Sequence, residues 1–272
     1  MDQPSPMQTP MPWNLVADAY TEEIVPMFEL YARDALAQAK LPAGARVVDV
    51  ACGPGTLAIL AAQAGAKVDA VDFSAAMIDH CKARLAQLGI TGVTPQVGDG
   101  QALPFDAHTF DAAFVMFGMM FFPDRAKGLA ELRRVLVPGG RAVIATWTPL
   151  EDTALLAAMF EAISTTATQI LGSAPPQREL PLTTEAACRA EVTAAGFRDV
   201  TVRRVSFTQT FPSANELWGS IERTMAPIVL MKRALGDKWS QIGEAARLAI
   251  NGVNGAGAGE LNMTALVTSG TA

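Results

Sequence analysis

The sequence predicts an α/β protein built around a largely parallel sheet with helices on both faces. Strand-like and helix-like segments alternate from residue 45 to residue 147, which is typical of repeated strand–helix–strand units. The chain has 272 residues, of which 50% are hydrophobic and 18% charged, so it can bury a sizeable core. A turn of small residues, in VVDVACGPGT at residues 47–56, follows the first strand-like segment. The ligand-binding edge of the sheet is expected there.

The first forty residues are expected to form an N-terminal arm and a helical leader, followed by one main domain over residues 41–272. Residues 1–13 hold Asp2 and several prolines, without the basic and apolar regions of a secretory signal. Residues 15–40 favour a helix, although Pro26 should break or begin it. Apolar residues close to helical spacing are Ile24, Met27, Phe28, Tyr31 and Leu36.

The alternating region has a readable order of elements. It runs from the strand RVVDVA through the helix LAILAAQAG, the strand KVDAVD, the helix SAAMIDHCKARLAQLG, the strands VTPQVGD and FDAAFVMF, the helix RAKGLAELRRVL and the strand RAVIATW. Ser74 is the predicted N-cap of the second helix and Gly89 its predicted C-cap. The caps and the periodicity therefore agree.

The chain after Trp147 departs from this alternation. Helical insertions are expected at about residues 150–190 and 212–256, and the second lies between two strand-like segments, 200–211 and 261–269. The second insertion is a candidate lid. In the segment 200–211 the apolar phase slips between Val202 and Val205, which predicts a bulge or bend.

Charge and composition exclude several classes of partner. The net charge of −6 and the scattered Lys and Arg argue against nucleic-acid binding and favour a small-molecule partner. The cysteines are Cys52, Cys81 and Cys188, whose spacing suggests free thiols in a reducing compartment rather than a disulfide or zinc site. The apolar run 112–123 is too short to cross a bilayer, which takes ~20 residues. We expect a cytoplasmic protein without a membrane span, with a homodimer as one option for its assembly.

The glycine turn admits more than one ligand when it is taken alone. Gly53, Gly55 and Ala58 satisfy the G-x-G-x-x-A spacing of a dinucleotide site, with Asp72 at the end of the next strand. A nicotinamide site leaves Asp49, inside the preceding strand, and the later acidic turn GDGQALPF without a role.

The motifs taken together resemble those of class I S-adenosylmethionine-dependent methyltransferases. The similar segments are VVDVACGPGT, VDAVDFSAAMI, VGDGQALPFDAHTFDAAF and ELRRVLVPGGRAVIATW, which occur in the order of that family and cover residues 45–148. The segment FGMMFFPD is similar to that of the quinone-biosynthesis and related small-molecule (type 11) methyltransferases. The resemblance implies a Rossmann-like seven-stranded, mostly parallel sheet with an antiparallel last strand, helices on both faces and helical insertions forming a lid.

The resemblance also implies S-adenosylmethionine as the cofactor and assigns its contacts. Asp49 would attract the ammonium, Asp72 would accept both ribose hydroxyls, and Asp99 would accept from the adenine amine. The full implied set is Asp49, Ala51, Gly53, Gly55, Asp72, Phe73, Met77, Asp99, Gly100, Gln101, Phe117 and Tyr20. Simpler interpretations stay open, with Asp99 as a turn former, Met77 as a core residue and Tyr20 as an anchor of the leader.

The acceptor and the catalytic groups are less defined. The run after the fourth strand offers a hydrophobic acceptor pocket or plain packing, and its candidate pocket residues are Met119, Met120 and Phe122. His80 and His108 are expected away from the site, so no catalytic base is named, and no set of metal ligands is recognised. The leading hypothesis is methyl transfer to a small, largely apolar acceptor. The alternatives are a non-catalytic cofactor-binding protein and a nicotinamide-dependent oxidoreductase.

Overall fold

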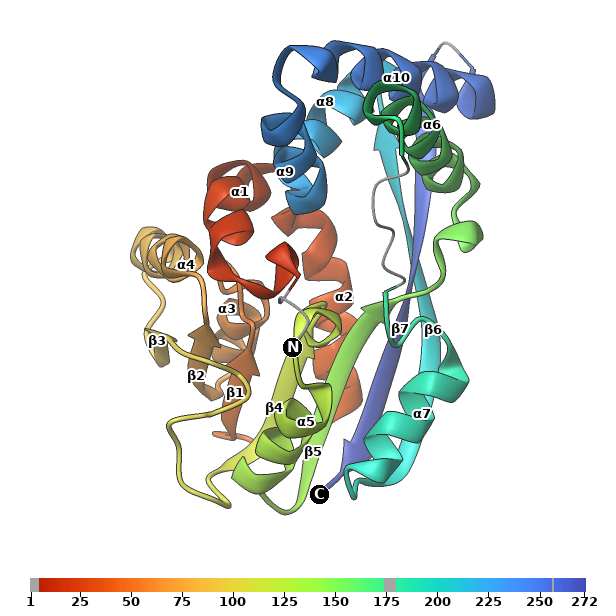
Figure 1. The fold of residues 1–272 in the computed structure, drawn as a ribbon. Coiled ribbons are helices and arrows are strands. Elements are labelled where there is room, and N and C mark those ends of the chain that lie inside the picture. Colours follow the sequence, from red (N-terminus) through yellow and green to blue (C-terminus); the bar gives the residue numbers. More distant parts are fainter. Residues whose placement is uncertain (1–4, 174–179, 256) are drawn as a thin grey trace.

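The computed structural model describes residues 5–173, 180–255 and 257–272 (Figure 1). Within them, seven strands form one sheet in the order β3-β2-β1-β4-β5-β7-β6, and β7 runs antiparallel to both of its neighbours. The strands are β1 Arg46–Val50, β2 Lys67–Asp72, β3 Val93–Val97, β4 Phe110–Met116, β5 Leu136–Trp147, β6 Arg198–Phe211 and β7 Gly259–Thr271. The predicted Rossmann-like mixed sheet is confirmed.

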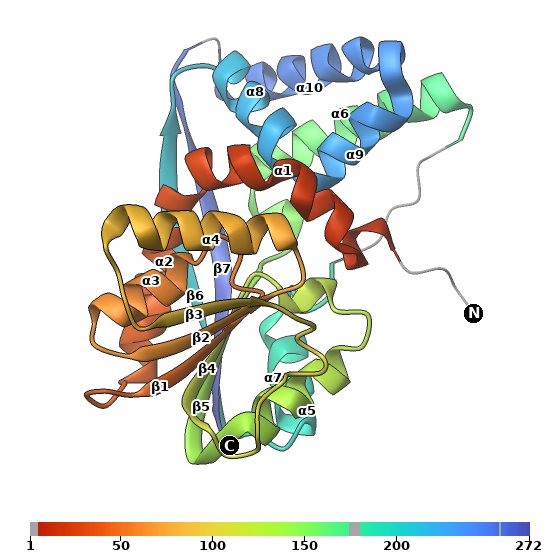
Figure 2. The same cartoon turned by 90° about the vertical axis from the view of Figure 1, so that its left-hand side faces the viewer.

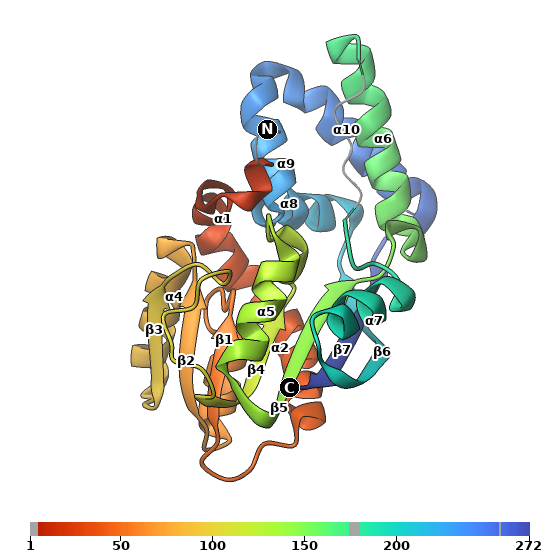
Figure 3. The same cartoon turned by 60° about the horizontal axis from the view of Figure 1, so that its bottom comes forward.

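Helices cover both faces of this sheet. On one face α2 (Val25–Ala39) and α3 (Thr56–Gln63) pack on apolar side chains of β1, β4 and β5. On the other face lie α5 (Arg125–Val135) and α7 (Glu185–Ala194), seen in front of the sheet in Figure 3. Val47 and Val48 are buried against opposite faces, because successive strand residues point to opposite sides. The central strands therefore read as continuous apolar runs.

The leader consists of two helices, α1 (Pro10–Glu23) and α2, with a short 3₁₀ turn η1 (Pro6–Gln8) before them. Pro26 occupies the second position of α2, so the prediction that it would begin a helix is confirmed. Helix α1 lies between α4 (Ala75–Leu88) and α9 (Ala226–Leu235), as Figure 2 shows. The predicted caps of α4 are also confirmed, since Ser74 Oγ accepts from the Met77 N–H and Gly89 adopts φ 63°.

The C-terminal end of β6 and the N-terminal end of β7 extend past the end of β5. They carry a layer of helices, which we call the helical cap. It consists of α6 (Ala154–Leu171), α8 (Ala214–Thr224), α9 and α10 (Trp239–Asn254), with 3₁₀ turns η3 (Leu150–Asp152) and η4 (Gly236–Lys238). Helix α7, which begins within the expected first insertion, packs on the sheet instead. Residues 174–179 of that insertion lie outside the described residues. The predicted domain boundaries and the lid role stay predictions.

A bulge or bend is expected between Val202 and Val205, and the bulge is wrong, because β6 pairs with β7 in unbroken register from Thr201 to Phe211. The register shift lies earlier, between Arg198 and Thr201. Val202 packs on the α7 side of the sheet, whereas Val205 packs on the α2 side. The phase of the apolar residues therefore changes because the helix covering this edge strand changes sides.

Helix α6 is long and apolar enough to cross a membrane by length and composition alone, at 18 residues and a mean hydropathy of 1.3. One of its faces packs against α10, with Met159 and Ile163 buried in the same cluster as Ile242. This packing is what a core helix of the cap requires. The expectations of a cytoplasmic protein without a membrane span stay predictions.

Candidate active site

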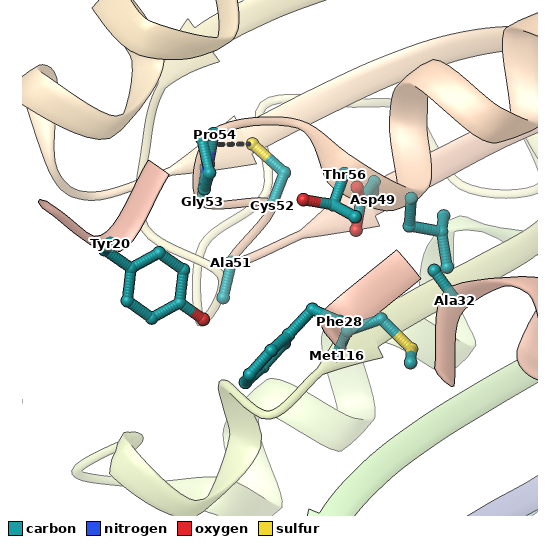
Figure 4. Close-up of a pocket in the computed structure, with 11 residues that line it drawn as sticks. Tyr20, Phe28, Ala32, Asp49, Ala51, Cys52, Gly53, Pro54, Thr56 and Met116 are labelled. Carbon is teal, nitrogen blue, oxygen red and sulfur yellow. Dashed lines mark hydrogen bonds between the residues drawn. The ribbon is translucent and has the colours of Figure 1, made fainter. Parts of the chain in front are cut away.

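A pocket lies at the carboxyl ends of β1 and β4, under the leader helices (Figure 4). The cavity is small, at about 40 Å³. In Figure 4 the Tyr20 hydroxyl points into it, opposite the turn that follows β1. Its lining consists of Tyr20, Phe28, Ala32, Asp49, Ala51, Cys52, Gly53, Pro54, Thr56, Leu57 and Met116.

The two glycines of the turn serve different purposes. Both have positive φ, 53° at Gly53 and 77° at Gly55, which favours glycine. A Cβ on Gly53 would meet nothing within 4 Å, whereas a Cβ on Gly55 would lie 2.4 Å from Cys81 Sγ of α4. Gly53 therefore leaves room for a ligand, and Gly55 allows the turn to pack on α4.

Asp49 is a buried carboxylate with one unsatisfied oxygen. It is 1% exposed, its Oδ2 accepts from the Ala58 N–H at 3.1 Å, and its Oδ1 has no partner in the described part of the chain. Burial, with a smaller contribution from Asp72, raises the pKa of Asp49 to about 8. An unpaired buried carboxylate is costly, so this position suits a ligand that brings a cation or a donor.

Asp72 ends β2 with both oxygens bonded to the backbone. Its Oδ2 accepts from the Gly53 N–H and its Oδ1 from the Ser74 N–H, both at 2.8 Å. Burial raises the pKa of Asp72 to about 6, and these two N–H bonds oppose the rise. Because each carboxylate oxygen has a further lone pair, the side chain can still accept two hydroxyls.

The leader closes this region from above. Burial, and next the charge of Asp72, raise the pKa of Tyr20 above its ordinary value. Asn14 Oδ1 accepts from Ser74 Oγ at 2.7 Å, so α1 is tied directly to the turn after Asp72. Nothing in the sequence pattern marks Asn14, because its role depends on a contact with a residue sixty positions away.

The remaining predicted cofactor residues lie along the neighbouring strand ends. Phe73 is half-buried, and Met77 packs in one cluster with Val16 and Ala17 of α1. Asp99 is exposed, and its Oδ1 accepts from the Gln101 N–H at 2.8 Å. Asp99 thus forms the turn that the simpler interpretation expected. Its contact with adenine stays a prediction, as do those of Phe73 and Met77.

The segment after β4 packs mainly inward. Met119 is fully buried near α5, Met120 is buried on the opposite face, and Phe122 lies between Gly100 and Gly128. None of these three lines the pocket as it stands, and their acceptor role stays a prediction. Phe117 (φ 60°) stacks on Trp147 with ring centroids 4.1 Å apart.

Aromatic side chains from distant segments gather around Phe117. Phe28 lies edge-on to Phe117 at 4.7 Å and to Trp147 at 5.8 Å, and it also lines the pocket. Tyr31 lies edge-on to the same two rings, and its hydroxyl donates to the Met263 carbonyl at 2.7 Å. The helical spacing of Phe28 and Tyr31 predicts that they are buried. It does not reveal that they meet the end of β5.

The two histidines lie away from the pocket lining. His80 Nε2 is 2.8 Å from Asp18 Oδ1 at the surface between α4 and α1, and His108 Nδ1 is 3.0 Å from the Leu136 carbonyl oxygen. Among the described residues there is no group of three or more His, Cys, Asp or Glu placed to hold a metal ion.

Cys52 is a free buried cysteine, as the sequence predicts, but its neighbour is another cysteine that the spacing does not reveal. Contact with the Cys81 thiol, followed by burial, raises the pKa of Cys52 well above its ordinary value. Both side chains are buried. These two residues are 29 positions apart in sequence, and the packing of α4 under the glycine turn brings them together. Buried free thiols of this kind behave as small apolar groups.

A Rossmann-like sheet with a glycine turn after β1 and buried carboxylates on β1 and β2 defines the class of folds that bind nucleoside cofactors at strand ends. Residues 47–140 match a family described as "Methyltransferase domain". The matched region covers about a third of the chain, and over it the chain is similar to the class I S-adenosylmethionine-dependent methyltransferases, a family whose methyl donor is S-adenosylmethionine.

The chain is similar to several known proteins. It is 45% identical over 102 residues to a demethylmenaquinone methyltransferase of Clavibacter sepedonicus, covering 38% of this chain and 41% of that protein. It is 39% identical over 113 residues to an uncharacterized protein of Mycobacterium tuberculosis, covering 42% and 41%. The chain therefore spans less than half the length of these relatives. A putative methyltransferase from Bacillus halodurans shares the fold, with TM-score 0.58, 19% identity and coverage of 88% and 97%.

Proposed function

We propose that this protein transfers a methyl group from S-adenosylmethionine to a small, largely apolar acceptor at oxygen, carbon or nitrogen. The observation that carries the proposal is Asp49, whose Oδ1 is buried beside the glycine turn and has no hydrogen-bond partner among the residues that the structure describes. The cofactor's ammonium would satisfy it, and a nicotinamide site offers no cation in that place. The residues present therefore fit this cofactor.

The chain's own groups would bind and orient rather than carry out proton chemistry. Asp49 would hold the ammonium and Asp72 the ribose hydroxyls, while Gly53 allows close approach to the backbone. The bound cofactor supplies a methyl group on a sulfonium, which is already a good leaving group. In-line alignment of the acceptor is then the main requirement, and a strong general base is not needed. Tyr20 and Phe28 would exclude water from above.

Calorimetric titration with S-adenosylhomocysteine tests the cofactor site. Asp72→Ala should weaken binding about tenfold or more, because a buried charged acceptor is lost. The matched control is Asp69→Ala, which should bind like the wild type. Asp69 lies on the same strand, but its Oδ2 is 3.9 Å from Arg46 Nη2. A wild-type protein that binds NADH but not S-adenosylhomocysteine would contradict the proposal.

A second candidate is a cofactor-binding protein of the same fold without turnover. It is favoured by the position of both histidines, which lie outside the pocket lining. Incubation with S-adenosylmethionine and a panel of phenols and quinols separates the two. Methylated product supports the enzyme, and tight binding without product from any acceptor class supports the second candidate.

A further inference from the structure

The turn between β3 and β4 is held by the side chain of Gln101. Its Nε2 donates to Asp99 Oδ1 at 3.2 Å, and its Oε1 accepts from the Asp124 N–H at 2.8 Å. The side-chain amide therefore uses both its nitrogen and its oxygen, and these two partners determine which way it faces. Gln101 links Asp99 to the start of α5.

These contacts limit the freedom of Asp99, which is otherwise an exposed side chain on a turn. Its Oδ1 receives two hydrogen bonds, one from the backbone N–H of Gln101 at 2.8 Å and one from the side chain. Both fall on the same oxygen, so Oδ2 is the atom left to accept from a ligand. Holding a carboxylate in one orientation before binding reduces the entropy that binding must remove.

The other side of the turn is fixed by packing. Gly100 is buried, and a Cβ there would lie 2.5 Å from Phe122 Cζ, so the Phe122 ring contacts the turn directly. The same ring reaches Gly128 in α5, and Asp124 caps α5 by accepting from the Lys127 N–H at 2.9 Å. The segment 122–124 thus supports the turn from below, while Gln101 ties it laterally.

We propose that Gln101 is a positioning residue that orients Asp99 toward the exocyclic amine of the cofactor's base and thereby sets the preference for adenine. This inference rests on the proposed function. A 6-amino group donates to a carboxylate, whereas a 6-oxo group places an acceptor opposite it and is repelled. Specificity of this kind comes from the orientation of one acceptor.

The test compares S-adenosylhomocysteine with S-inosylhomocysteine, in which oxygen replaces the amine. The wild-type protein should prefer the adenosyl compound by about tenfold, the effect of one hydrogen bond to a charged group. Gln101→Glu keeps the acceptor for the Asp124 N–H but removes the donor to Asp99 and adds a like charge. The preference should fall to about threefold or less. Gln101→Met removes both side-chain hydrogen bonds, to Asp99 and from the Asp124 N–H. It is the second variant and should lower the preference to a similar extent.

The matched control is Gln38→Glu, since Gln38 also donates to a carboxylate, Asp34, in α2 away from the pocket lining. It should keep the wild-type preference. The inference is overturned if both Gln101 variants keep the tenfold preference while losing affinity for both compounds equally, which is a purely structural effect. A wild-type protein that binds both compounds equally also overturns it. If the wild type binds neither compound, the proposed function itself fails.

Discussion

The cofactor end of the sheet and the helical cap differ in what is buried. At the ends of β1 and β2 the structure buries two carboxylates, Asp49 and Asp72, and within residues 5–173, 180–255 and 257–272 one oxygen of Asp49 has no hydrogen-bond partner. In the described part of the helical cap the buried side chains are apolar apart from Thr224, whose hydroxyl donates to the Ser220 carbonyl at 2.8 Å, and the Trp218 and Trp239 rings stack with centroids 5.9 Å apart. Burying the Asp49 oxygen costs folding free energy that a ligand can offset, whereas the helical cap, as far as the structure describes it, has no such cost. Substitutions should therefore separate binding from stability.

The largest expected effect is on stability, in the cap. Ile242→Ala should cost about 2–5 kcal/mol of unfolding free energy, because the side chain is fully buried and its removal leaves a cavity. Leu248→Ala, in the same helix but 57% exposed, should change it by less than about 0.5 kcal/mol. Urea denaturation measures both. Equal costs at the two positions would mean that α10 does not pack as described.

In the glycine turn, one substitution should mainly lower stability and the other should mainly weaken ligand binding. Gly55→Ala should destabilise by about 1–3 kcal/mol, because its Cβ meets Cys81 and its φ is positive. Gly53→Ala should cost about 1 kcal/mol of stability while weakening binding of S-adenosylhomocysteine, since its Cβ enters open space in the pocket. Thermal unfolding and calorimetry distinguish the two. Restoration of stability in Gly55→Ala/Cys81→Ala would identify the clash as the cause.

Cofactor binding should depend on pH. The pKa of Asp49 is raised to about 8, so the carboxyl is protonated in the free protein at pH 6, and a bound ammonium favours its ionised form. Binding should release a proton, and affinity should rise by up to about tenfold per pH unit from pH 6 to pH 8. The same raised pKa means that the stability of the free protein falls as pH rises through this range. Calorimetric titrations in buffers of different ionisation enthalpy count the protons released. An affinity that does not change between pH 6 and pH 8 would contradict this role of Asp49.

The smallest effect is expected at the surface, where the helical cap meets the leader that covers the cofactor end of the sheet. Arg223 of α8 contacts Glu23 of α1, with Nε and Oε1 2.7 Å apart. The Arg223 side chain is 56% exposed, so Arg223→Gln should cost less than about 1 kcal/mol. A loss of several kcal/mol on chemical denaturation would mean that the leader depends on this pair. In that case the two regions could not be treated as separable.

The sequence predicts the region with unusual chemistry better than the region with ordinary packing. Asp49 inside a buried strand and Asp72 at the next strand end are polar residues where apolar ones are expected, and the two glycines between them have a spacing that the structure explains. The cap could be predicted only as helical, because apolar residues such as Ile242 do not encode which partner they meet. The phase change in β6 likewise depends on where α7 and α2 lie.

Several site contacts could not be read from the sequence because they join distant segments. Asn14 meets Ser74, Phe28 meets Trp147, and Cys52 meets Cys81 only after the leader and α4 are in place. Periodicity shows that such residues face inward, and nothing local shows what they face. The contacts by which the leader covers the pocket could therefore not be predicted from the sequence.

The measurement that tests the account most directly is calorimetric titration of S-adenosylhomocysteine into the wild-type protein and Asp49→Asn at pH 8, with thermal unfolding of both. The account predicts that the variant binds at least about tenfold more weakly and is at least as stable, because it removes a buried charge that only the ligand satisfies. Unchanged affinity in a stably folded variant would contradict the assignment of Asp49 to the cofactor.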